Sequence, residues 1–190
     1  MPALLTRRQI EVLAAARIGH PWNPRSDVYL KRLSEAAGLS RLSLAIARVP
    51  PGKESFLYHR HERDEEFLFI LTGRGRAEIG GDVFEVGPGD FMGFAAPDGP
   101  PHHLANPYEE DLVYLMGGES SGFDVAHFPR LGRRLVFTPS GVWSVAEDGC
   151  EKIDSSAWRR DEGADQRSKS TATVLSQETS TPSRSPGDGW

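Results

Sequence analysis

The feature that most constrains this chain is a series of short segments in which apolar and polar residues alternate, separated by Gly and Pro and not by helical patterns. In the first, Leu42, Leu44 and Ile46 alternate with Ser and Ala until a Pro-Pro-Gly run ends the segment. Further strands are expected at 67–71, 76–79, 83–86, 91–94, 112–116, 135–137 and 142–145. This pattern predicts an antiparallel sandwich or barrel rather than a parallel α/β sheet.

Different patterns mark the two ends of the chain. Thr6 and Gln9 form a capping-box pattern, and apolar residues then recur at helical spacing until Gly19, which predicts a short N-terminal helix. From Asp161 onward Ser, Thr, Gly, Pro and charged residues dominate, which predicts a disordered C-terminal tail. We therefore expect a helix and linker at 1–27, a barrel with flanking strands at 28–150, and a disordered tail at 151–190.

Composition excludes several classes of function. The 22 basic and 27 acidic residues give a net charge of −5 without a basic stripe, so a nucleic-acid partner is not expected. Cys150 is the single cysteine, which excludes an internal disulfide, fits a reducing cytoplasm and leaves oxygen and nitrogen atoms as metal ligands. No apolar run has the length of a signal peptide or a spanning helix, so we expect a cytoplasmic protein with no membrane partner.

The histidines are the most informative residues for function. They stand at positions 20, 59, 61, 102, 103 and 127. On a strand, His59 and His61 point to the same face and can share one ion. Glu66 has the wrong parity for that face on one straight strand, but the polar 62–64 step can bend the chain and reset it. On a later strand, His102 shares a face with Asn106 and would complete the cluster.

These residues follow two motifs of a known family. The first is His59-x-His61, four residues, Glu66, six residues and Gly73, in the stretch HRHERDEEFLFILTG. The second is Pro97-x-Gly99-x-x-His102-x-x-x-Asn106, preceded by a Pro88-Gly89-Asp90 turn. Over residues 40–117 the chain resembles the cupin superfamily, and in particular its small bacterial single-domain members, most of which have no assigned reaction. The resemblance implies an all-β fold, the double-stranded β-helix or jelly-roll barrel.

The match departs from the family pattern at two loops. Gly52 stands one residue further from His59 than is usual, and Gly89 stands two residues further from Pro97. An alignment that puts the 95–97 stretch in the Pro-x-Gly position, with a longer loop before His102, is nearly as good. Both alignments keep His102 in the motif.

Three imidazoles and one carboxylate suit a divalent transition ion better than Ca²⁺, which prefers oxygen ligands alone. We therefore predict a single ion (Fe, Mn, Ni, Cu or Zn) bound by His59, His61, Glu66 and His102, with two positions open on a six-coordinate ion. Glu65 is the alternative to Glu66, since a three-residue gap also occurs in cupins. A barrel that has lost its metal, or uses these residues structurally, is the alternative to the whole site.

The remaining candidates have simpler interpretations. His103 should point away from His102, and His20 and His127 lie outside the motifs. Asn106 is expected to hold local backbone with its amide. The phenylalanines are interpreted as core packing; they are Phe67, Phe69, Phe91 and Phe94. No catalytic residue is assigned, and Tyr58, Glu65 and Tyr114 are candidates for a base only because they lie near the motif strands or the core.

Three functions are compatible with this reading. The preferred one is a metal-dependent oxygenase or oxidase that acts on a small organic substrate. A redox-neutral reaction of the kind that cupin sugar isomerases carry out is the second, and a non-catalytic module that binds a metal or small ligand is the third. A homodimer is expected from the resemblance and from sheet edges that need covering.

Overall fold

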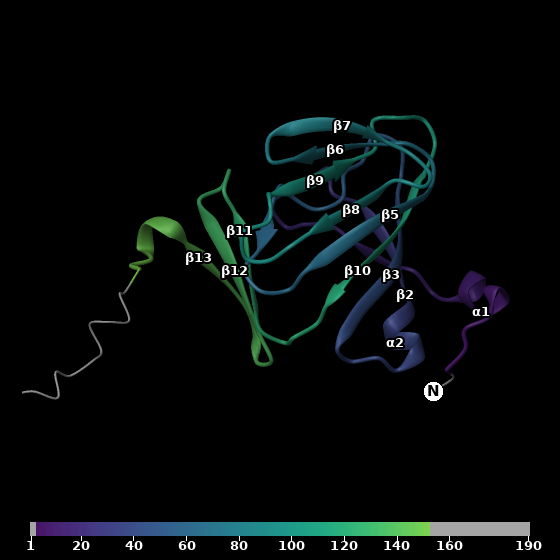
Figure 1. The fold of residues 1–190 in the computed structure, drawn as a ribbon, viewed down its shortest axis with the longest axis horizontal. Helices are drawn as coiled ribbons and strands as arrows, with labels where there is room; N and C mark the ends of the chain where they lie inside the picture. Colours follow the sequence, from purple (N-terminus) through teal and green to yellow (C-terminus); the bar gives the residue numbers. More distant parts are fainter. Residues whose placement is uncertain (1–2, 153–190) are drawn as a thin grey trace, which may run out of the picture. The chain divides into compact units, whose positions relative to one another are not determined.

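The computed structural model describes residues 3–152, and its regular secondary structure consists mainly of antiparallel strands (Figure 1). The helices are α1 (Arg7–Val12), α2 (Leu33–Ala37) and the one-turn η1 (Glu147–Gly149). The strands are β1 (Ala16–Ile18), β2 (Val28–Arg32), β3 (Leu42–Val49), β4 (Arg60–His61), β5 (Glu66–Thr72), β6 (Gly75–Ile79), β7 (Asp82–Val86), β8 (Phe91–Phe94), β9 (His102–Ala105), β10 (Leu112–Glu119), β11 (Asp124–Phe128), β12 (Arg133–Thr138) and β13 (Gly141–Ala146). The predicted all-β fold is confirmed.

The strands form three sheets. Their orders are β1-β2-β3-β10-β5-β8, β13-β12-β11-β4 and β7-β6-β9. Strands that are distant in the sequence lie side by side, because β10 pairs with both β3 and β5. A short backbone bridge between His59 and His102 connects the segment before β4 to β9. This bridge brings the two predicted motifs together.

Strand alternation explains where the core lies. In β3, Ala45, Ala47 and Val49 are buried, and they pack in one cluster with Ile70 of β5. Leu104 of β9, in the three-stranded sheet, belongs to the same cluster. The inner faces of two sheets therefore share one apolar core, as in a jelly-roll barrel.

The N-terminal helix is shorter than predicted. It has the predicted capping box, with Thr6 and Gln9 bonded reciprocally, but it ends at Val12 and buries no residue. Lys31 Nζ donates hydrogen bonds to the carbonyls of Ile10 and Glu11 at its end. The next residues form β1, in which Ala16 pairs with Leu30 of β2. A helix without a buried face has little tertiary support. The chain therefore leaves the helix and forms a strand that pairs with β2.

The expectation that four phenylalanines pack in the core is wrong for Phe91 and does not describe Phe67 or Phe69, which are only half-buried. Phe94 is buried, but Phe91 is 64% exposed and Phe67 is half-buried on the outer face of its sheet. The reason is alternation, since Glu66 and Leu68 on either side of Phe67 point inward. Phe67, Phe91 and Phe94 line a groove that is described below.

Three remaining predictions concern Asn106, the C-terminal tail and membrane-spanning helices. The amide of Asn106 donates to the carbonyls of Val49 and Glu110 at 2.9 and 2.7 Å, which confirms its predicted structural role. The predicted disordered tail lies outside the described residues from 153 onward. In the part of the chain that the structure describes, no helix has the length and apolarity to cross a membrane.

Candidate metal centre

The two histidines of the first motif are positioned by backbone pairing on both sides. His59 exchanges two backbone hydrogen bonds with His102, of 3.0 and 2.8 Å. His61 lies in β4 and pairs with Ala126 of β11. The imidazole of His59 lies 5.0 Å from that of His61 and 4.8 Å from that of His102, measured between ring centroids. The predicted convergence of these rings is therefore present.

Glu66 joins them because the chain turns between β4 and β5. The turn at 62–64 resets the parity, so that Glu66 points inward together with buried Leu68 and Ile70. Its carboxylate contacts Nε2 of His102 and lies 3.6 Å from Nε2 of His61. Donor atoms of His59, His61 and Glu66 all lie within 4.8 Å of one another. We call these three residues and His102 the inner cluster.

The alternative ligand, Glu65, does not join this group. Its side chain is exposed, and its backbone N–H donates to a carboxylate oxygen of Glu119 at 3.4 Å. Glu66, which has the parity of Leu68, contacts the histidines instead, as the six-residue gap to Gly73 predicts.

Hydrogen bonds orient two of the rings. Nδ1 of His59 donates to the carbonyl of Leu57 at 2.6 Å, and Nδ1 of His61 donates to the carboxylate of Asp124. A neutral imidazole that donates from Nδ1 has its lone pair on Nε2, which is the arrangement of metal-bound histidines. The ring of His102 is buried and stacks on Phe94, with centroids 3.5 Å apart.

The surroundings favour a neutral His59 and a charged Glu66. Burial lowers the pKa of His59 to about 3. Burial would raise the pKa of Glu66, but the hydrogen bond with His102 and the neighbouring imidazoles outweigh it and lower that pKa to about 2. For His61, the hydrogen bond with Asp124 and the nearby carboxylates outweigh burial and raise the pKa. Among the described residues, no Lys or Arg forms an ion pair with Glu66.

These observations fit a bound cation. Nitrogen and oxygen donors on a transition ion lie about 2.0–2.2 Å from it, and hence within a few ångströms of one another. The inner cluster provides three nitrogen donors and one carboxylate that pairs with no Lys or Arg among the described residues. The donor set suits a divalent transition ion, as the sequence predicts, but it does not identify the metal.

Asp124 supports the candidate centre, although the sequence did not single it out. One carboxylate oxygen accepts from His61, and the other accepts from the backbone N–H groups of Arg63 and Asp64 at 3.1 and 3.4 Å. It therefore holds both the ring of His61 and the turn that directs Glu66 inward. The signal was its alternation with buried Ala126 in β11, but nothing in the sequence paired β11 with β4.

The other histidines lie apart from the inner cluster. His103 occupies the opposite face of β9, where its Nε2 lies 3.4 Å from Glu54. Glu54 is paired with Arg25, and nearby Glu78 is paired with Arg130. We call these five residues the outer cluster.

The two remaining histidines also lie apart from the inner cluster. His20 packs on Trp22 and Phe128, and His127 contacts Glu147, so neither reaches the candidate centre.

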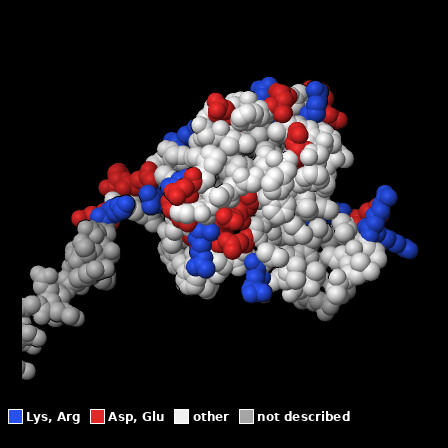
Figure 2. All heavy atoms as spheres, in the orientation of Figure 1, with Lys and Arg blue, Asp and Glu red and all other residues white. Residues whose placement is uncertain are grey.

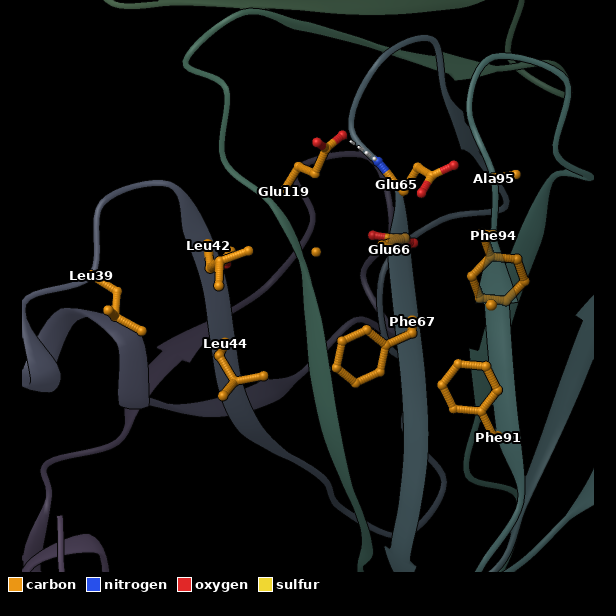
Figure 3. A pocket seen from close by; sticks show the side chains of 13 residues that line it. Leu39, Leu42, Leu44, Glu65, Glu66, Phe67, Phe91, Phe94, Ala95 and Glu119 are labelled. Carbon is orange, nitrogen blue, oxygen red and sulfur yellow. Dashed lines mark hydrogen bonds between the residues drawn. The ribbon is translucent and has the colours of Figure 1, made fainter. Parts of the chain in front are cut away.

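Two cavities with room for a ligand adjoin the inner cluster, and a third, closed space beside it is lined by Arg60. A small cavity of about 130 Å³ is lined by His61 and Glu66 together with acidic side chains. An apolar groove of about 520 Å³ is lined mainly by leucines and phenylalanines and reaches Glu65 and Glu119. The two cavities share lining residues, which are Ser43, Glu65, Glu66, Gly118 and Glu119. A ligand in the groove can therefore extend toward the candidate centre (Figure 3).

Comparison with known proteins agrees with this architecture. The cupin domain family matches residues 45–118. A crystal structure from Acidithiobacillus ferrooxidans, "Putative sugar phosphate isomerase", is 30% identical, with a TM-score of 0.77 over 80% of this chain and 97% of that one. A sugar phosphate isomerase of a cupin superfamily from Silicibacter pomeroyi is 23% identical, with a TM-score of 0.69 over 79% of this chain and 96% of that one, and it supports the fold alone.

A curated relative is similar over a shorter stretch. An uncharacterised protein of Methanocaldococcus jannaschii is 41% identical over 64 residues, which are 34% of this chain and 49% of the relative. The matched stretch thus spans about half the length of that relative. Taken with the fold and the two motifs, these comparisons show that the chain belongs to the cupin superfamily.

Proposed function

We propose that this cupin is a mononuclear metal-dependent enzyme that acts on a small organic substrate, and that its reaction is an oxygenation or oxidation. The observation that carries the proposal is the inner cluster, in which three imidazoles surround a carboxylate without a basic partner, beside a cavity that opens to a groove. A bound cation would balance the charge of Glu66, with which no described Lys or Arg pairs.

The chain's own residues divide the work. Nε2 of His59, His61 and His102 and the carboxylate of Glu66 would hold the ion, while Asp124 orients His61. The ion when bound supplies Lewis-acid polarisation of a substrate oxygen or, if it is redox-active, electron transfer involving dioxygen. The apolar groove holds the substrate's body and keeps water from it.

Oxygen uptake tests the reaction class. The full-length protein, loaded in turn with Fe²⁺, Mn²⁺, Ni²⁺ and Cu²⁺, is assayed with an oxygen electrode against catechol, enediol, flavonol and thiol substrates. We expect uptake with at least one pair, abolished in Glu66→Gln and retained in His103→Ala. If no pair consumes oxygen while the ion is bound, the oxygenase assignment is wrong.

A redox-neutral isomerisation is the second candidate function. Similarity to the Acidithiobacillus protein favours it, and Glu65 and Glu119 at the mouth of the small cavity are carboxylates that can accept or return a proton. However, neither the groove nor the small cavity is lined by a described Lys or Arg, so a phosphate group has no cationic partner there. Isomerisation of a sugar at equal rates with and without oxygen would replace the first proposal.

Three further expectations stay predictions. A non-catalytic binding module would bind the ion without turning over any substrate, and it is the outcome if both assays above are negative. The homodimer is tested by sedimentation of the full chain, and the cytoplasmic location by fractionation of the producing cell.

A further inference from the structure

The outer face of the six-stranded sheet carries an apolar row beside the candidate centre. Register places Leu44, Gly117, Phe67 and Gly93 next to one another across β3, β10, β5 and β8. Phe91 adds an exposed ring at the β8 edge. The row ends near Glu66, whose side chain occupies the inner face of the same sheet. The groove therefore meets the small cavity beside the inner cluster at Glu65, Glu66 and Glu119.

Glycines shape the floor of this groove. A Cβ on Gly117 would lie 2.7 Å from both Leu44 Cδ1 and the ring of Phe67, so these side chains rest on the bare backbone. The ring of Phe91 leans over Gly93 in the same way, at 3.1 Å from the position of a Cβ. The rings of Phe67 and Phe91 are stacked at 5.8 Å between centroids. The result is a concave apolar surface rather than a flat sheet face.

The end of the groove nearest the centre is acidic. Figure 3 shows Glu65 and Glu119 at that end, with Glu66 between them and the apolar side chains. Figure 2 shows acidic side chains gathered where β5 begins and β10 ends, with basic side chains next to them and a broad surface of neither sign to one side. The small cavity beyond is lined by further carboxylates, Asp64 and Asp124. Five carboxylates thus line the groove end and the small cavity, and no described Lys or Arg lines either space.

We propose that the groove binds an organic amine, with its apolar body on Leu44, Phe67 and Phe91 and its ammonium group between Glu65 and Glu119. Burial of apolar surface supplies most of the affinity, and the carboxylates supply the selectivity for positive charge. Calling this amine the substrate rests on the proposed function, whereas its binding does not. The absence of lining Lys and Arg among the described residues argues equally against anionic ligands.

Three probes that share one apolar body test the proposal. Phenylpropylamine, phenylpropanol and phenylpropionate are titrated calorimetrically into the full chain, first after chelator treatment and then with Zn²⁺ added. We expect the amine to bind most tightly and the carboxylate most weakly under both conditions. Phe91→Ala should weaken the amine and the alcohol alike by about tenfold. Glu119→Gln should reduce the preference for the amine over the alcohol by about threefold.

Phe84→Ala is the matched control, because Phe84 is another exposed phenylalanine, on β7, outside the groove. Its affinities should equal those of the wild type, and circular dichroism checks the fold of each variant. Absence of amine binding, equal binding of amine and carboxylate, or a dimer that Phe91→Ala dissociates would overturn the inference, the last because a second copy covers the groove. Amine binding by protein that binds no metal would leave the groove standing and refute the proposed function instead.

Discussion

Adjacent residues of β9 belong to two clusters that differ in whether an arginine pairs with the carboxylate. His102 faces inward and meets Glu66, and no described Lys or Arg pairs with that carboxylate. His103 faces outward and meets Glu54, which Arg25 already pairs. Each cluster combines imidazole with carboxylate, yet of the two only the inner cluster has a carboxylate without a described Lys or Arg partner and imidazole nitrogens that converge. Charge balance, rather than the mere presence of His and Glu, distinguishes a candidate metal site from a structural network.

The largest expected effect comes from removing the unbalanced carboxylate. Glu66→Gln should lower the affinity for Zn²⁺ or Mn²⁺ by more than about 100-fold, since it removes a ligand and the charge that attracts the ion. Isothermal titration of chelator-treated protein measures this change. Glu54→Gln, in the outer cluster, is the matched control and should leave the affinity unchanged. Equal losses in both variants would erase the distinction between the clusters.

Metal should stabilise the fold through the inner cluster alone. At a free Zn²⁺ concentration of roughly 100 times its Kd, the free energy of unfolding should rise by about 2.7 kcal/mol, because the ion binds the folded chain. Urea unfolding with and without Zn²⁺ measures this rise. It should persist in His103→Ala and disappear in His59→Ala. A rise of the same size in His59→Ala would show that the ion binds elsewhere.

The residue that orients His61 should have a smaller effect. Asp124→Asn should lower the metal affinity by about 10–100-fold, because the amide holds the ring less firmly and withdraws a negative charge. Competition with a chromogenic chelator measures it. Glu147→Gln, which changes the carboxylate beside His127, serves as the control. An unaltered affinity in Asp124→Asn would mean that β4 and β11 position the ring without this contact.

The smallest effect is expected in the outer cluster. The hydrogen bond from Arg130 holds the pKa of Glu78 below its usual 4.5. This pair therefore contributes stability above pH 4.5, and the contribution is lost as the pH falls through the folded-state pKa. Glu78→Gln should cost less than about 1 kcal/mol at neutral pH, since Arg130 is largely exposed. Urea unfolding of the wild type and of Glu78→Gln is measured from neutral to acid pH. The difference in their free energies of unfolding should vanish in acid, and a difference that stays constant would contradict this prediction.

Period-two alternation made much of the fold and the inner cluster predictable. It placed His59 and His61 on one face and, with the turn at 62–64, directed Glu66 inward. The same alternation, applied consistently, would have placed Phe67 outside, where the structure has it. Asp124 could not be found this way, because its role depends on the pairing of β4 with β11 across more than 60 residues. Local patterns fix the direction of a side chain but not its partners.

Anomalous diffraction from crystals grown with Mn²⁺ or Zn²⁺ tests the central claim most directly. We expect one strong peak per chain, about 2.0–2.3 Å from Nε2 of His59, His61 and His102 and from the Glu66 carboxylate, with none at His103. A peak in the outer cluster, or none at the inner cluster in well-ordered crystals grown with excess metal, would contradict it.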